Sequence, residues 1–134
     1  MTSIRSIAIA AIFSFGLGPH LAWADPVSDV CAALANARTA LYSMINAKDV
    51  ATQGVLDAKV REASTRLESA LAGMTGANAK AAADFKVLWD QFRSTRDNEI
   101  IPEIYKGNSG EAKKVADGIQ HERLSRMWSI MSCR

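Results

Sequence analysis

Apolar residues recur at intervals of three and four along four long segments of the chain, and this spacing restricts its fold more than any other feature. The first segment carries Val27, Val30, Leu34, Ala37, Leu41 and Met44, and the second carries Leu56, Val60, Ala63, Leu67, Leu71 and Met74. Such spacing places the apolar side chains on one face of a helix. No stretch alternates apolar and polar residues as a half-buried strand does, so the sequence predicts an all-α protein.

The third segment contains an internal proline. Its apolar positions are Ala81, Phe85, Leu88, Trp89 and Phe92, and they continue through Ile100, Ile101, Ile104 and Tyr105. Pro102 interrupts this run. Because proline has no amide proton and crowds the carbonyl four residues earlier, we expect a kink there and a rotation of the apolar stripe.

Caps and turns mark where the helices begin and end. Asp25 is expected to cap the first helix, with Pro26 in its first turn. A turn over residues 106–110, which reads Lys-Gly-Asn-Ser-Gly, precedes the last helix, and Ser109 is its expected cap. The apolar face of the last helix is predicted to comprise Ala112, Ala116, Ile119, Met127 and Ile130.

Four helices of similar length with short connections favour an antiparallel up-down-up-down four-helix bundle over residues 25–134. When positions are mirrored about turns near residues 49, 76 and 108, one layer of this bundle comprises Cys31, Leu67, Phe85 and Met131. Cys133 lies within one helical turn of that layer, so this fold brings the two cysteines together.

Residues 1–24 have the layout of a cleaved signal peptide. Arg5 precedes an apolar run over residues 7–17, and Ala22 and Ala24 flank Trp23 in the pattern of a cleavage site. The alternative, an uncleaved membrane anchor, needs roughly 20 apolar residues, which is longer than this run. We therefore expect export to the periplasm. In that oxidising compartment Cys31 and Cys133 are predicted to form a disulfide, while two free thiols or a soft-metal site with Met127 and Met131 are the alternatives.

The composition excludes several classes of function. The chain has a formal net charge of +2 and no basic block that could track a phosphate backbone, so no nucleic-acid partner is expected. No phosphate-binding glycine loop and no grouping of nucleophile, base and orienting residue occurs, so no catalytic residue, and hence no enzyme, is predicted. His121, the only histidine after residue 24, is expected to be exposed, and no metal site is predicted.

Charged residues lie on or beside the predicted inward faces. Arg96 follows Trp89 by helical spacing, and Asp57 and Arg123 lie beside apolar positions of their own helices. A buried charge is costly unless it is paired. One interpretation is an internal ion pair between Asp57 and Arg96 or Arg123. The other is a site for a small anionic ligand, formed by Arg93, Arg96, Arg123, Trp89 and Asp57.

Arginines also recur three residues apart, as Arg93 with Arg96 and as Arg123 with Arg126. Such pairs equally fit a solvated face or a homodimer contact.

The stretch from Phe85 to Met127, FKVLWDQFRSTRDNEIIPEIYKGNSGEAKKVADGIQHERLSRM, is similar to the periplasmic four-helix-bundle sensor domains of bacterial chemotaxis receptors. The shared features are an aromatic pair, an R-x-x-R-[DE] stretch, an apolar residue before proline, a Lys-Gly turn and G-I-Q-x-x-R. The resemblance implies a bundle that senses small molecules, often as a dimer. The sequence ends at Arg134 without a second membrane helix or a signalling module, so we expect a free bundle that binds a ligand, a membrane receptor or another envelope protein.

Two other classes of function stay open at this stage. Periplasmic b-type four-helix cytochromes look similar in size and hold haem between a methionine of the first helix and a histidine of the last. The corresponding neighbourhoods here offer Cys31 and Ile130, so haem would need Met127 or Met131 with an unusual partner, and no cofactor is expected. The third class is a structural envelope protein that acts only through its interactions.

Overall fold

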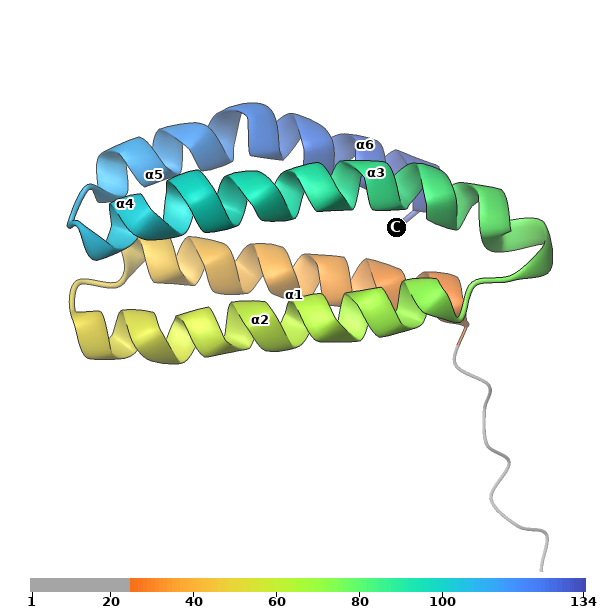
Figure 1. Cartoon of the computed structure of the whole chain (residues 1–134), viewed down its shortest axis with the longest axis horizontal. Coiled ribbons are helices and arrows are strands. Elements are labelled where there is room, and N and C mark those ends of the chain that lie inside the picture. Colours follow the sequence, from red (N-terminus) through yellow and green to blue (C-terminus); the bar gives the residue numbers. More distant parts are fainter. Residues whose placement is uncertain (1–24) are drawn as a thin grey trace, which may run out of the picture.

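The computed structural model describes residues 25–134, and these form four helical rods (Figure 1). The first rod is α1 (Pro26–Asn46) and the second is α2 (Val50–Ala72). The third rod joins α3 (Ala79–Thr95), η2 (Arg96–Ile100) and α4 (Ile101–Tyr105), and the fourth joins α5 (Ser109–Val115), η3 (Ala116–Gln120) and α6 (His121–Met131). A single 3₁₀ turn, η1 (Gly76–Asn78), lies between α2 and α3.

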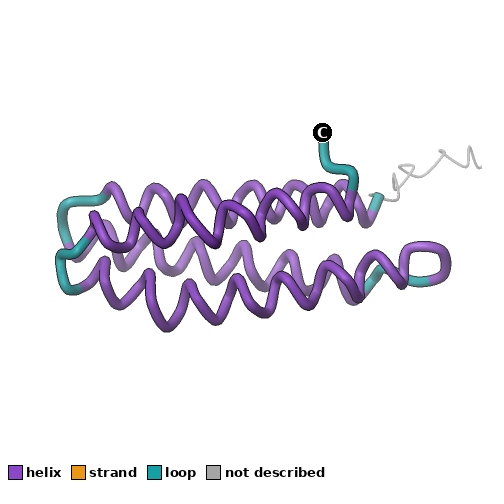
Figure 2. The backbone as a smooth tube through the Cα atoms, turned by 90° about the horizontal axis from the view of Figure 1, so that it is seen from above, coloured by secondary structure: helices purple, strands orange, loops and turns teal. Residues whose placement is uncertain are grey.

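The prediction of an all-helical chain with four helices is confirmed, because no strand occurs in residues 25–134. The rods lie side by side, with the α1–α2 and α4–α5 connections at one end (Figures 1 and 2). The α2–α3 connection, the start of α1 and the end of α6 lie at the other end. The signal peptide predicted for residues 1–24 lies outside the described residues. None of the helices within 25–134 is both long and apolar enough to cross a bilayer.

The core is made by the apolar stripes that the sequence predicts. Of the first two stripes, all positions are buried except Val27 and Leu56, which are partly buried and pack against the core. Leu67, Phe85 and Met131, which were predicted to share a layer, all belong to this core. The largest fully buried side chain is that of Trp89, which stacks on Phe92 with their ring centroids 5.5 Å apart.

Side chains and glycine set the ends of several helices. The Asp25 carboxylate accepts a hydrogen bond from the Val27 amide (3.1 Å), which confirms the predicted cap of α1. Gly107 has a φ of 83° and ends α4, with the Asn108 amide donating to the Glu103 carbonyl (2.8 Å). The predicted cap at Ser109 is wrong: Ser109 is already the first helical residue, and no side chain caps α5.

Two π-helical turns, η2 and η3, interrupt the regular α-helix of the third and fourth rods, and the second of them accompanies a wrong prediction. At η2 the Ile101 amide donates to the Arg96 carbonyl, and the chain stays helical through Pro102, which lies in the first turn of α4. At η3, Gly118 leaves helical geometry (φ −89°, ψ −110°). The inward position predicted for Ile119 is wrong, since 45% of this residue is exposed, and Gln120 is buried instead. The wider turn adds a residue between successive inward positions and so rotates the stripe.

The first and last rods are linked by a disulfide between Cys31 and Cys133, as predicted (Cα–Cα 5.6 Å). Cys133 follows Ser132, which has a φ of 51° and turns the chain after α6. The Cys133 amide donates to the Trp128 carbonyl (3.0 Å), a turn that directs Cys133 toward α1. The two linked cysteines are 102 residues apart in the sequence, so the disulfide restricts nearly the whole described chain.

Replacing both cysteines by alanine is expected to lower the free energy of unfolding by about 4 to 5 kcal/mol, because a long closed loop restricts the unfolded chain most. Urea denaturation of the oxidised parent and the double variant measures this difference. Far-ultraviolet circular dichroism of the variant at low temperature should keep its helical signal. Equal stabilities of the two proteins would contradict the structural role of the link.

The first and last rods are also joined by a polar contact. The Tyr42 hydroxyl on α1 donates to the Asp117 carboxylate on η3 (2.8 Å), and Asp117 also pairs with Lys113. Burial and the adjacent Asp117 raise the pKa of Tyr42 from 10.0 to about 12. The Lys113 and Tyr42 hydrogen bonds lower the pKa of Asp117.

The Tyr42 contact predicts a change of stability at alkaline pH. Because the folded-state pKa of Tyr42 lies above its ordinary value, the contribution is fully present below pH 10 and is lost as pH rises through about 12. Tyr42→Phe should remove this part of the alkaline loss, as measured by thermal melts of both proteins across that range. Identical alkaline profiles would contradict the contact.

Candidate functional site

The sequence predicts that one group of residues forms a single anion site. In the structure these residues do not come together, and they lie on two sides of α3. Trp89 and Arg93 meet Glu68 of α2: the Trp89 indole N–H donates to Glu68 Oε1 (3.1 Å), and Arg93 forms an ion pair with the same oxygen. The Glu68 carboxylate raises the pKa of Arg93 above its ordinary value. Arg123, on α6, instead contacts α3 through Gln91 and Thr95.

Arg96, the first residue of η2, contacts Ser64 of α2, and only 2% of this residue is exposed. Its guanidinium donates to Ser64 Oγ (2.6 Å) and, through Nε and Nη2, to both carboxylate oxygens of Asp97 (2.8 and 3.2 Å). The guanidinium carbon lies 6.0 Å from the centre of the Trp89 ring. Arg96 therefore packs and pairs within the protein.

Asp57 does not pair with Arg96 or Arg123, so the predicted internal ion pair is wrong. Its carboxylate lies 3.1 Å from Nε of Arg61, one turn along α2, and accepts a hydrogen bond from the Tyr105 hydroxyl (3.2 Å). Desolvation and the Asp57 charge raise the pKa of Tyr105. Asp57 thus links α2 to α4 at the edge of the bundle.

Arg123 joins α6 to α3 through a buried amide. Its Nη1 donates to Thr95 Oγ1 (2.7 Å) and to Gln120 Oε1 (2.9 Å), and Gln120 in turn donates to the Phe92 carbonyl (2.8 Å). Gln120 is only 1% exposed, so these bonds satisfy a polar group inside the core. This is a structural network between helices.

The remaining predicted positions lie apart from this network. His121 is exposed, as expected. Met127 and Met131, which the haem and soft-metal alternatives need, are buried in the apolar core. Within residues 25–134, no three His, Cys, Asp or Glu side chains are grouped as a metal ion requires.

A groove of about 320 Å³ lies between α2 and α3, beside the Trp89–Glu68–Arg93 cluster. Its apolar lining comprises Leu71, Ala72, Ala82, Ala83 and Trp89, of which Trp89 is almost fully buried and borders the groove from the core. Its charged rim consists of two ion pairs, Glu68 with Arg93 and Lys86 with Asp90. An apolar surface with a few converging polar groups is the usual form of a small-ligand site. Two of the predicted ligand-binding residues, Trp89 and Arg93, therefore do line one groove.

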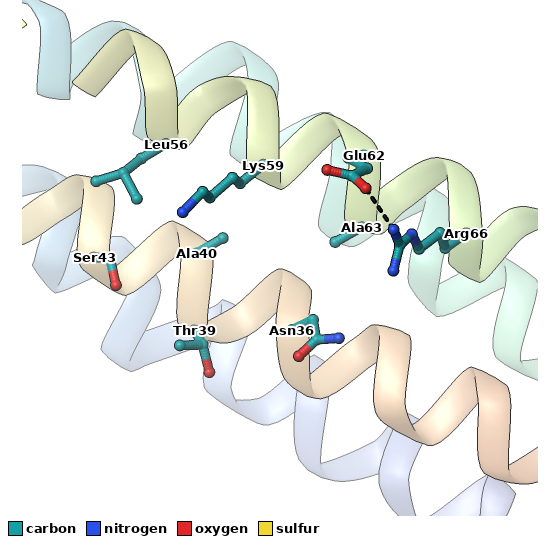
Figure 3. Close-up of a pocket in the computed structure, with 9 residues that line it drawn as sticks. All are labelled: Asn36, Thr39, Ala40, Ser43, Leu56, Lys59, Glu62, Ala63 and Arg66. Atoms are coloured by element: carbon teal, nitrogen blue, oxygen red, sulfur yellow. Dashed lines mark hydrogen bonds and ion pairs between the residues drawn. The ribbon is translucent and has the colours of Figure 1, made fainter. Parts of the chain in front are cut away.

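A second groove, of about 290 Å³, lies between α1 and α2 (Figure 3). Figure 3 shows Lys59 extending between the two helices near Ala40, and the Glu62–Arg66 ion pair at one end. Its lining is mostly small or polar, with Leu56 as the one large apolar side chain. It offers a ligand less apolar surface than the α2–α3 groove.

Glu68, Lys86 and Asp90 were missed by sequence reasoning. Glu68 directly follows the inward Leu67 and precedes Leu71 by three, which places an acid at the edge of an apolar stripe. That position could have identified Glu68 as a contact between helices, because residues at the edge of one helix's apolar stripe face the edge residues of the neighbouring helix. Lys86 and Asp90 are spaced four apart like many pairs on solvated helix surfaces, and nothing in the sequence marks them as a rim.

No family model matches the chain, and comparisons with curated proteins and with solved structures also found no match.

Two substitutions at Arg96 test its structural role. Arg96→Met should change the free energy of unfolding by less than about 1.5 kcal/mol, because methionine keeps packing against Trp89 and the freed Asp97 side chain is 32% exposed to water. Arg96→Ala should cost about 2 to 4 kcal/mol, because it leaves a cavity. Urea denaturation compares them, and an equal loss in both variants would contradict packing as the main contribution.

Proposed function

We propose that this chain is a non-enzymatic, exported binding protein, an antiparallel up-down-up-down bundle that holds a small ligand in the groove between α2 and α3. The observation that carries the proposal is the pairing of an apolar groove surface with a charged rim at one place. The Trp89 indole lies at the boundary of the two, with its N–H on Glu68. A ligand with an apolar body and a polar group would contact both parts.

The different exposure of Arg96 and Arg93 supports a binding role for this groove rather than for the centre of the bundle. Arg96 donates to partners within the protein and is almost fully enclosed, so a ligand could not reach it without opening the core. Arg93 is 42% exposed in its side chain and lies on the rim. The anion interaction predicted for these residues is therefore proposed for Arg93 alone.

We propose a periplasmic location on two grounds. Residues 1–24 have the composition of a signal peptide, and the Cys31–Cys133 disulfide is compatible with an oxidising compartment. The resemblance to chemotaxis sensor domains over residues 85–127 includes the charged part of the α3 wall and Trp89, but not Ala82 and Ala83. That overlap supports an accessory or sensory role, in which a membrane receptor or another envelope protein responds to the loaded bundle.

Two-dimensional NMR of residues 25–134 with a panel of small organic compounds tests the binding function. A groove ligand should shift the indole N–H signal of Trp89, because that proton is bonded to the rim residue Glu68. The indole of Trp128, which lies beside the disulfide, serves as the internal control. If no compound shifts the Trp89 signal in a saturable way, the groove is not a binding site.

A further inference from the structure

The rim of the α2–α3 groove carries equal numbers of opposite charges. Arg93 and Lys86 are cationic, and each is paired with one carboxylate, Glu68 or Asp90. Three of these residues, Lys86, Asp90 and Arg93, lie on successive turns of α3, and Glu68 faces them from α2. The rim is therefore neutral as a whole but strongly polar.

In each of these ion pairs, one carboxylate oxygen accepts no hydrogen bond from the other rim residues. Both hydrogen bonds to Glu68 end on Oε1, and the Lys86 ammonium meets Asp90 through Oδ2. The side chains of Glu68 and Arg93 are 41% and 42% exposed, and those of Lys86 and Asp90 are more exposed still. Exposed pairs of this kind contribute about 0 to 1 kcal/mol each, so they rearrange at little cost.

The apolar part of the groove lies next to these charges. Leu71 and Ala72 of α2 face Ala82 and Ala83 of α3, near the end of the bundle where η1 joins the two helices. The side chains of the three alanines are small, which leaves room for a short aliphatic group. A ligand chain placed there would bring its polar end to Glu68 and Arg93.

We infer that the ligand of this groove is an aliphatic zwitterion, a molecule that carries an ammonium and a carboxylate on one short apolar chain. The inference rests on the proposed function of the groove. The ligand carboxylate would face Arg93 and Lys86, and its ammonium would face Glu68 and Asp90. Every charge of the rim then keeps an opposite partner. A ligand with one charge would instead offer an opposite partner to only two of the four rim groups and none to the other two.

Binding of three related probes to residues 25–134 tests the inference, with the Trp89 indole signal as the readout. The probes are L-leucine, isocaproate, which lacks the ammonium, and isoamylamine, which lacks the carboxylate. L-leucine should bind about tenfold or more tightly than either analogue, as expected when a charge-assisted hydrogen bond is lost. Equal or tighter binding of a single-charge analogue would overturn the inference.

Variants of rim residues, each with a control variant outside the groove, test whether the rim charges cause the preference for L-leucine. Asp90→Asn should weaken L-leucine binding about tenfold and strengthen isocaproate binding, because the rim becomes net positive. Asp84→Asn is the control, since Asp84 forms the same kind of pair with Lys80 on α3 but does not line the groove. Glu68→Gln and its control Glu62→Gln repeat the comparison on α2 and test the α1–α2 groove of Figure 3. If the controls weaken L-leucine as much as the rim variants, the inference is wrong.

The outcomes also separate the inference from the proposed function. If other compounds shift the Trp89 signal but L-leucine does not, the groove binds small molecules and the zwitterion is the wrong class. If no compound shifts it, both proposals fail.

Discussion

Burial of one apolar stripe from each of four rods is the interaction on which the rest of the structure depends. Burying a large aliphatic or aromatic side chain contributes about 1.5 to 3 kcal/mol, and the core holds many of them, from Val30 to Met131. This burial fixes which faces of α2 and α3 point inward. Glu68, Arg93 and Trp89 then meet at the edge of the core, where a charge still reaches water. The groove thus forms where the apolar stripes of α2 and α3 give way to the charged residues at their edges.

The helices and their inward faces could be predicted from the sequence because both follow from local spacing. The apolar stripes of α1 and α2 could be predicted from the helical period alone. The disulfide could be predicted once four helices were assumed to fold back on one another. The prediction failed at Ile119 because the wide turn at η3 shifts the local register, so that Gln120 faces inward instead, whereas Met127 further along is buried as predicted. Nothing in the local sequence except Gly118 signals that turn.

The site could be predicted only in part, because side-chain pairing depends on lateral geometry that spacing does not give. Mirroring about the turns gives the height of a residue along the bundle but not the direction in which it points. Asp57 accordingly pairs with Arg61 on its own helix, and Arg123 turns to α3 on the side away from α2. Trp89 and Arg93, both named for the predicted site, lie one turn apart on α3, whereas their partner Glu68 belongs to another helix. Arg96 is 2% exposed, whereas the Arg93 side chain on the rim is 42% exposed, and this difference in solvent access is why the proposed ligand contact is given to Arg93.

Intermolecular nuclear Overhauser effects between L-leucine and isotope-labelled protein test most directly whether the α2–α3 groove is the binding site. The methyl groups of the probe should show effects to the methyl groups of Leu71, Ala82 and Ala83, which line the apolar part of the groove. Effects to Leu56 and Ala63 would place the probe in the α1–α2 groove instead. That result, or the absence of any effect at saturating probe, would contradict the account.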